Sequence, residues 1–276
     1  MITAPRVGRD GALSLHVERR GARSTLVGSR FTLPLQVLVP VALDDAACVV
    51  SLLNPTGGLV DGDRLAVDVR VGEGAHVCLT TPSATRVYRS IGSAAEQRVR
   101  LVLGPRAVCE WVPDHTIPSD GAALRQCLTA ELAPGATLIA IDAFAAGRVA
   151  RGEAWRFASL DSTLTVDDAD GPLLYDRFVL DGAASWAGLG LAEAHPYWAT
   201  IALLGDHGLD EFVTALPAQL GSRCGAVAGV ARLVRRGLLV RCLAADAPVF
   251  IEMLHAIWTL ARHCLLGLPS LALRKL

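Results

Sequence analysis

Residues 65–81, LAVDVRVGEGAHVCLTT, decide the fold of this 276-residue chain, because they combine a strand pattern, a glycine turn, an alanine and a second strand pattern. The same order recurs in RVRLVLGPRAVCEWVPD (98–114) and LTAELAPGATLIAIDA (128–143). The shared alanines, Ala75, Ala107 and Ala136, are spaced about 30 residues apart, a period typical of stacked supersecondary units. The alternative is a plain β-sandwich whose hairpins share turn chemistry.

The rest of the chain continues the β pattern and then changes character. From residue 11 to about 190, short alternating runs are broken by Gly, Pro and Asp, and residues 169–171 indicate a further hairpin turn. Helical periodicity appears over about 209–220 and 249–265, with the alternating segment AVAGVARLVRRGLLVRCLA between them. No stretch has the composition of a linker. We therefore expect one domain over residues 1–276, mainly β, with two helices and a β-hairpin between them.

Composition excludes several classes of protein. Hydrophobic residues make up 52% and charged residues 19% of the chain, and the formal net charge is −1, so no electrostatic footprint for nucleic acid or anionic lipid exists. No unbroken apolar stretch approaches the ~18–20 residues of a membrane span, and the N-terminus is too charged for a signal peptide. The seven cysteines include no close pair, which favours reduced thiols. These features predict a soluble cytoplasmic protein that binds neither nucleic acid nor membrane.

Familiar catalytic motifs are missing. Lys275 is the only lysine, so the chain has no phosphate-binding P-loop and no plausible Schiff-base lysine. It has no G-x-S-x-G or H-E-x-x-H motif either. His76 and Cys78 lie two residues apart on one predicted strand, so they could share a metal, although two half-buried strand residues are the preferred interpretation. The glycine-rich stretch GGLVDGDRL (57–65) lacks the register of a calcium loop and the lysine of a phosphate cradle, and alone it indicates a turn.

The glycine-rich turn also belongs to a longer pattern. The segment NPTGGLVDGDRLAVDVRVGEGAHVCLTTPSATRVYRS (54–90) resembles the signature region of the urease accessory protein UreD family, also called UreH. Further similar segments are CEWVPDHTIPSDGAALRQ, DAFAAGRVARGEAW, ARLVRRGLLVRCLA and WTLARHCLLGLP, in the family's order. Three departures stand out: His115 replaces an acid or amide, Asp176 replaces a glutamate, and the chain ends SLALRKL where the family has a P-R-I-W type segment.

The resemblance implies a nonenzymatic maturation factor. Proteins of this family bind apo-urease and the partner UreF, which recruits the GTPase UreG, and the complex delivers nickel to the urease active site. No cofactor is therefore expected to stay bound, and nickel is expected only in transit. The resemblance also implies a helical, solenoid-like stack of β-strands with two helices, in agreement with the repeat. Because nucleotide chemistry belongs to a partner, the missing P-loop is consistent with this function.

Ion delivery also predicts which residues line the route. A passage must bind an ion weakly enough to release it, and spaced carboxylates, hydroxyls and carbonyls do this better than thiolate or imidazole clusters. In the repeat register, Thr81 and Asp142 both fall six residues after the shared alanine. We therefore predict a polar inner wall for nickel, although a turn acid or a capped strand end is the alternative for each residue; the candidates are Asp61, Asp63, Thr80, Thr81, Ser83, Thr85, Glu110, Asp120, Asp142 and Asp176.

Two other functions remain open. A stand-alone β-rich enzyme could use a carboxylate pair such as Glu110 and Asp120, as glycosidases do, but aromatic residues are only 5% of the chain, which is few for a sugar site. A β-solenoid interaction module without ion traffic is the other alternative. A continuous polar passage inside the fold would distinguish nickel delivery from that module.

Overall fold

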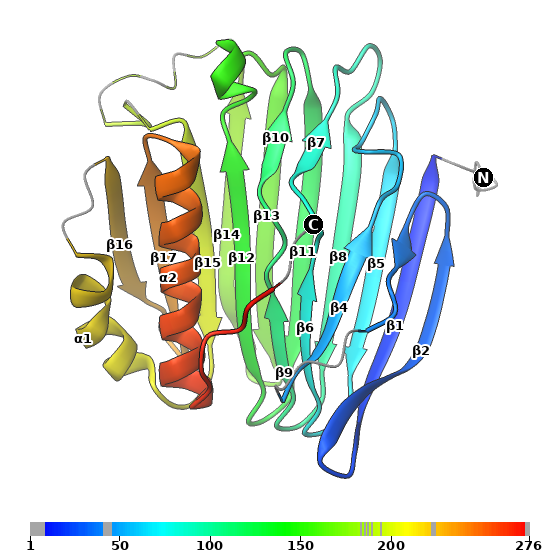
Figure 1. The fold of residues 1–276 in the computed structure, drawn as a ribbon, viewed down its shortest axis with the longest axis vertical. Helices are drawn as coiled ribbons and strands as arrows, with labels where there is room; N and C mark the ends of the chain where they lie inside the picture. Colours follow the sequence, from blue (N-terminus) through cyan, green and yellow to red (C-terminus); the bar gives the residue numbers. More distant parts are fainter. Residues whose placement is uncertain are drawn as a thin grey trace.

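The computed structural model describes residues 9–40, 46–182, 184, 186, 188, 190–193, 195–221 and 225–273. Two β-sheets face each other, and both helices lie on the outer side of the second sheet (Figure 1). The mainly β architecture with two helices is therefore confirmed.

The first sheet has seven strands in the order β14-β13-β11-β8-β5-β1-β2. Its inner five strands run parallel, and the two edge strands are antiparallel to their neighbours. The strands are β1 (Asp10–Arg20), β2 (Arg23–Thr32), β5 (Arg64–Val71), β8 (Ala95–Leu103), β11 (Ala123–Leu132), β13 (Ser159–Asp168) and β14 (Gly171–Asp181). The hairpin predicted around residues 169–171 is thus the antiparallel pair β13–β14.

The second sheet has ten strands, with the main order β16-β17-β15-β12-β9-β6-β4-β3 and with β7 and β10 off this path. Strands β4, β6, β9 and β12 are parallel, whereas β15, β16 and β17 are joined by antiparallel pairing. The strands are β3 (Gln36–Val37), β4 (Cys48–Leu53), β6 (His76–Thr80), β7 (Thr85–Val87), β9 (Val108–Trp111), β10 (Thr116–Pro118), β12 (Thr137–Ala145), β15 (Tyr197–Leu204), β16 (Ala226–Arg232) and β17 (Gly237–Ala244).

The chain alternates between the two sheets, so successive strand pairs form stacked coils. Strands β5, β8 and β11 lie in the first sheet, and each is followed by a strand of the second sheet, β6, β9 and β12 respectively. The fully buried Ala75, Ala107 and Ala136 occupy equivalent places, because the residues after them pair in one register, with His76 and Thr137 each opposite Val108. Their turns stack through backbone hydrogen bonds. The solenoid-like interpretation of the repeat is therefore confirmed.

Two hydrophobic layers hold the coils together. One lies between the sheets, and the other lies between the second sheet and the helices. Strand β12 contributes to both, since Ala140 and Phe144 face the opposite sheet while Ile139 and Ile141 face the helices. A parallel strand covered on both faces has a near-continuous apolar sequence, as the segment TLIAIDAFA does. Asp142 interrupts this run on the inward side.

The helices, α1 (Leu209–Leu220) and α2 (Ala247–Leu266), occupy the predicted places. Helix α1 has the expected bounds, and α2 starts two residues before the predicted 249 and ends one after the predicted 265. Asp246 caps α2 by accepting the Val249 N–H at 2.9 Å. The αL residue Gly208 precedes α1, and a Cβ there would lie 2.0 Å from the Cys264 carbonyl oxygen, so glycine is required for this close approach.

Helix α2 is long and apolar enough to span a membrane by length and composition alone. Its apolar face nevertheless packs on the second sheet, where Phe250, Ile257 and Ala261 are fully buried. The apolar face of this helix is therefore a core face.

Candidate functional site

A cavity of about 140 Å³ lies between the two sheets. Apolar side chains form much of its wall, but polar groups from both sheets and from the connecting loops also face it. These polar lining residues are Asn54, Thr81, Ser83, Thr85, Gln97, Asp114, Thr116, Gln126 and Asp142. The cavity thus brings oxygen and amide groups together inside an otherwise apolar core.

Asp142 is a partly buried carboxylate that lines this cavity and bridges the two sheets. It projects inward from β12, since Ile141 and Ala143 on either side face the helices. From the opposite sheet, the Gln126 Nε2 donates to Asp142 Oδ1 at 2.7 Å and the Ser162 Oγ donates to Asp142 Oδ2 at 2.7 Å. Both donors are neutral. The carboxylate is therefore hydrogen-bonded without a direct ion pair.

Burial raises the pKa of Asp142 to about 6, and the negative charge of Asp176 adds to this effect. The hydrogen bonds from Ser162 and Gln126 act in the opposite direction, because they stabilise the charged form. At neutral pH the carboxylate remains mainly ionised, and its two neutral hydrogen-bond donors balance only part of its negative charge. Such a group attracts a cation more strongly than an ion-paired carboxylate does.

Polar residues continue from Asp142 toward the end of the sandwich, through Thr200 to the ion pair of Arg241 and Asp176. In the second sheet Asp142 pairs in register with Thr200, which pairs in turn with Arg241. Arg241 forms a salt bridge with Asp176 of β14, whose side chain is largely buried. Polar residues therefore extend from the cavity to the exposed Arg241 on β17, next to the end strand β16. Of the predicted residues, Asp176 belongs to this extension and does not line the cavity.

Four of the predicted residues line the cavity itself: Thr81, Ser83, Thr85 and Asp142. The Thr81 Oγ1 accepts the Asp114 N–H at 2.9 Å and donates to the Ser83 carbonyl oxygen at 3.0 Å, which fixes the loop after β6. Strands β6 and β9 end at Thr80 and Trp111 while β12 continues through Asp142, so the paired register of the repeat stops before Thr81 and Asp142.

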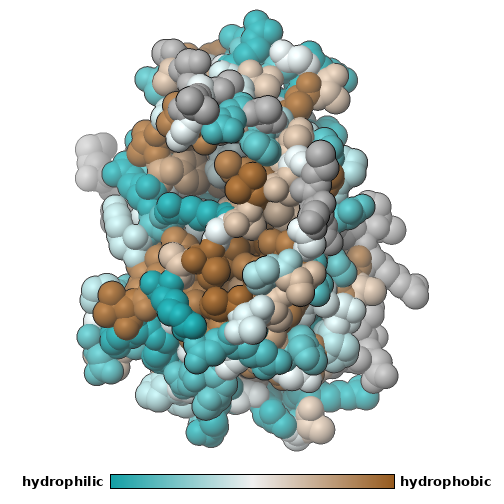
Figure 2. All heavy atoms as spheres, turned by 90° about the vertical axis from the view of Figure 1, so that its left-hand side faces the viewer, coloured by the Kyte–Doolittle hydropathy of each residue, from teal (hydrophilic) through white to brown (hydrophobic). Residues whose placement is uncertain are grey.

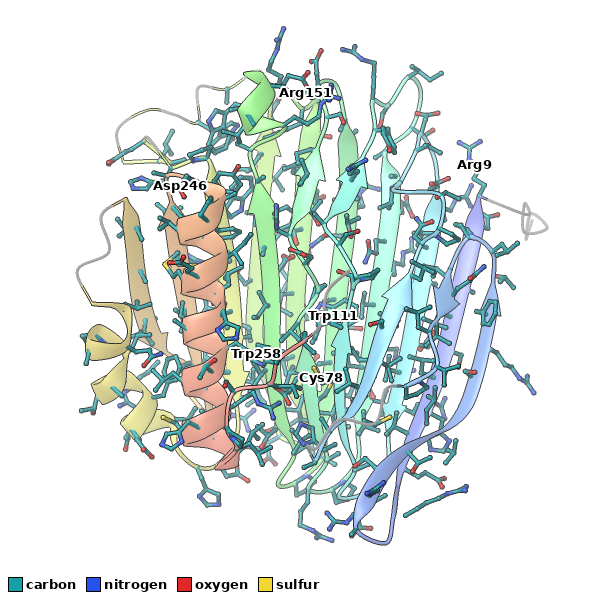
Figure 3. All side chains as sticks on the ribbon, viewed as in Figure 1. Arg9, Cys78, Trp111, Arg151, Asp246 and Trp258 are labelled. Atoms are coloured by element: carbon teal, nitrogen blue, oxygen red, sulfur yellow. The ribbon has the colours of Figure 1, made fainter. Side chains whose placement is uncertain are left out.

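Glu110 lies on the other face of the second sheet, so its assignment to the inner wall was wrong. Its carboxylate accepts the Trp258 Nε1–H at 2.7 Å, pairs with His76 Nε2 at 2.7 Å and forms a salt bridge with the fully buried Arg262. Figure 3 labels Trp258 on α2 and Cys78, which lies on β6 two residues after His76. Burial opposes the charge of Glu110, but His76 and Arg262 outweigh it and keep its pKa below the usual range. This cluster fastens α2 to the sheet.

Asp61 and Asp63 also do not line the cavity. The Asp61 Oδ1 accepts the backbone N–H groups of Ser93, Gly92 and Ile91 at 2.7, 2.9 and 3.0 Å, which lower the pKa of its carboxyl group. Asp63 is buried, and its Oδ2 accepts the Val60 N–H at 2.9 Å, while its Oδ1 has no hydrogen-bond partner among the described residues. The two carboxylates therefore organise the glycine-rich loop and the segment that packs on it, which is the turn interpretation of GGLVDGDRL.

The remaining predicted residues have local partners. The Thr80 Oγ1 donates to the Val112 carbonyl oxygen at 2.9 Å. Asp120 is partly exposed and forms a salt bridge with Arg89 at 2.5 Å. Since Glu110 is enclosed under α2 and Asp120 pairs with Arg89, the two carboxylates share no partner in the described part of the chain, and the carboxylate-pair enzyme loses its proposed site.

Thiolate ligation has no support in the residues that the structure describes. The six cysteines among them are reduced thiols, and burial raises the pKa values of Cys109 and Cys242, the latter to about 12, so these two thiols stay protonated at neutral pH. No group of three His, Cys, Asp or Glu side chains in the described ranges could hold a metal firmly. His76 and Cys78 are both buried on β6, and the His76 Nε2 pairs with the Glu110 carboxylate at 2.7 Å.

Sequence reasoning missed Gln126 and Ser162, the two donors to Asp142. Their neighbours Leu124 and Leu128 on β11, and Leu160 and Leu164 on β13, lie in the apolar layer between the sheets. A polar residue at the centre of an apolar face was therefore a readable signal on both strands.

Sequence comparison finds relatives that match nearly the whole chain. Residues 9–275 match the family model described as UreD urease accessory protein. A relative from Alkalilimnicola ehrlichii is 37% identical over 265 residues, which cover 95% of this chain and 89% of the relative. Another from Pseudomonas putida is 34% identical over 278 residues, covering 98% and 97%, and one from Cupriavidus metallidurans is 32% identical over 272 residues, covering 95% and 92%. All three are named urease accessory protein UreD.

Proposed function

We propose, from the premise that this chain belongs to the UreD family of urease accessory proteins, that it passes nickel toward apo-urease through the polar interior between its two sheets. Family membership supports a role in urease maturation. We further propose that UreF-like and UreG-like proteins assemble with the chain, and that the chain itself is not an enzyme. In this proposal the work takes place in the cytoplasm.

The observation that carries the proposal is the row of oxygen ligands around Asp142. Carboxylate, hydroxyl and amide oxygens bind nickel more weakly than thiolate or imidazole clusters do, and a passage needs such weak sites. Asp142 can exchange its bonds to Gln126 and Ser162 for an ion without leaving a fixed cation unpaired. Water completes the coordination of an ion at such a site. The cavity and the Asp176 end of the row supply successive positions.

In this proposal the residues of the chain attract the nickel ion by negative charge and keep competing ligands out of the cavity. Asp142 supplies negative charge in a nearly apolar surrounding, where electrostatic attraction is stronger than in water. Thr81 and Thr85 supply hydroxyl groups along the same cavity. Buried neighbours such as Val67, Val99 and Ala140 exclude competing ligands and narrow the route.

The test is nickel content per urease after co-expression of urease with its accessory proteins. Omitting this chain should lower both nickel content and urease activity. Ala140→Leu fills the cavity without changing its polar groups and should lower loading in the assembled complex. Ala22→Leu adds the same bulk at an exposed turn position outside the cavity and should load normally.

Pull-down of the partners with each variant checks that the complex still assembles, because overpacking a core costs about 1–3 kcal/mol. Full nickel loading by an assembled Ala140→Leu complex would exclude passage through this cavity while leaving a maturation role intact.

A further inference from the structure

Strand β16 forms an open edge of the second sheet. It pairs with β17 and has no partner on its other side among the residues that the structure describes. A row of backbone N–H and C=O groups therefore faces outward there, ready to pair with another strand.

The other end strands of the two sheets are protected in ways that β16 is not. Strand β3 has only two residues, and β2 and β14 each have a register shift and carry charged side chains, such as Arg30 on β2 and Arg177 on β14. Short length, bulges and charge are the usual means of preventing edge pairing. Strand β16, AVAGVAR, pairs without a register shift and has its only charge at its last residue, Arg232.

An apolar groove of about 310 Å³ lies beside this edge, between α1 and β16. From β16 it is lined by alternate residues, Ala226, Ala228 and Val230, and from the helices by Val213, Leu216, Pro217, Leu220 and Met253. Figure 1 places α1 at the same end of the molecule as β16. A strand added to β16 would direct every second side chain to this side, so apolar residues at alternate positions would enter the groove.

The opposite side of β16 favours an acidic residue on the added strand. Gly229 pairs in register with Arg241, and a Cβ on Gly229 would meet no atom within 4 Å. The missing side chain leaves the Arg241 guanidinium, which is 65% exposed, accessible from the edge. A carboxylate opposite Gly229 could therefore pair with Arg241, flanked by the half-exposed Val227. Figure 2 looks onto this end of the molecule and shows hydrophobic residues gathered at the centre of the face.

We propose that β16 binds an extended segment of a partner protein by strand addition, with alternate apolar residues in the groove under α1 and an acidic residue opposite Gly229. A second copy of the chain fits less well, because residues 226–232 contain no acid to meet Arg241 and two copies would bring their arginines together. This binding site shares Arg241 with the polar row that starts at Asp142, but it does not require nickel to pass through the chain.

The probe is a blocked synthetic peptide in which valine alternates with threonine and one central glutamate. Its affinity for the full chain is measured by fluorescence anisotropy, and hydrogen exchange over residues 226–232 reports where it binds. We expect the glutamate peptide to slow exchange in this strand and to bind about tenfold tighter than the same peptide with lysine in place of glutamate. Arg241→Gln should remove that preference.

Val227→Asp places a negative charge beside the glutamate of the bound peptide and should abolish its binding, whereas Val234→Asp, on the fully exposed turn after β16, should bind like the parent chain. Equal binding of the glutamate and lysine peptides, or unchanged exchange over 226–232, would overturn the proposal. So would slowed exchange in this strand on raising the chain concentration without peptide, since that result assigns the edge to self-association.

Discussion

Glu110, which is buried, and Asp142, which is partly buried, lie on neighbouring strands of one sheet, yet they face opposite layers and differ in how their charge is compensated. Glu110 faces α2, where Arg262, Trp258 and His76 surround it. Asp142 faces the other sheet, where its hydrogen-bond donors are a neutral amide and a neutral hydroxyl. Accordingly the pKa of Glu110 is lowered and that of Asp142 is raised to about 6.

This difference separates a structural carboxylate from one that is available to a ligand. A cation that approached Glu110 would have to displace Arg262, which would then be buried without its carboxylate, a costly state. A cation that approached Asp142 would replace hydrogen bonds from groups that can turn to other partners. Burial alone therefore does not identify an ion-binding carboxylate, whereas the charge of its neighbours does.

The largest expected effect is on the Glu110 side. Glu110→Ala removes the carboxylate from the fully buried Arg262 and should lower the free energy of unfolding by about 3–5 kcal/mol, measured by urea denaturation. Glu131→Ala, which removes the exposed partner of Arg100, is the matched control and should change stability little. A cost below about 1 kcal/mol for Glu110→Ala would contradict the role of this cluster in fastening α2.

Asp142→Asn should raise the free energy of unfolding at neutral pH, whereas Glu110→Ala lowers it. Because the folded-state pKa of about 6 lies above the ordinary value of 3.8, the folded state binds more protons than the unfolded state between these pH values. The stability of the parent chain therefore falls as pH rises through this interval, by at most about 3 kcal/mol. Asn cannot ionise, so the variant should be more stable than the parent at pH ~7 and similar to it near pH ~4.

Urea denaturation of both proteins across this range measures that difference. A parent chain whose stability rises from pH ~4 to pH ~6 relative to the variant would show that Asp142 is charge-compensated after all.

A smaller effect is expected from the buried thiols. Cys109→Ala removes a sulfur atom from the core and should cost about 1–2 kcal/mol, with nickel loading retained in co-expression. Abolished loading in an assembled Cys109→Ala complex would instead indicate a thiolate relay.

The smallest effect is expected at Asp120. Its salt bridge with Arg89 is partly exposed, so Asp120→Asn should change the unfolding free energy by about 0.5 kcal/mol or less and leave loading unchanged. Loss of nickel loading by Asp120→Asn would indicate that Asp120 contacts the ion, contrary to its position at the surface.

The sequence predicted the fold better than it predicted the site. The shared alanines identified the stacked coils, and apolar periodicity located both helices, because these features repeat along the chain. It was harder to predict on which face of the second sheet each acidic side chain lies. Glu110 and Asp142 both lie on strands that are apolar on both sides, so alternation could not assign them, and the deciding partners Arg262 and Ser162 are 152 and 20 residues away, respectively.

The most direct test compares isosteric changes at the two carboxylates in one assay of nickel per urease, after co-expression with the accessory proteins and with pull-down as the assembly control. We predict that the complex with Asp142→Asn assembles but loads little nickel into urease. The assembled complex with Glu110→Gln should load urease normally. Normal loading with Asp142→Asn together with failed loading by an assembled Glu110→Gln complex would contradict this prediction, and would place the ion route under α2.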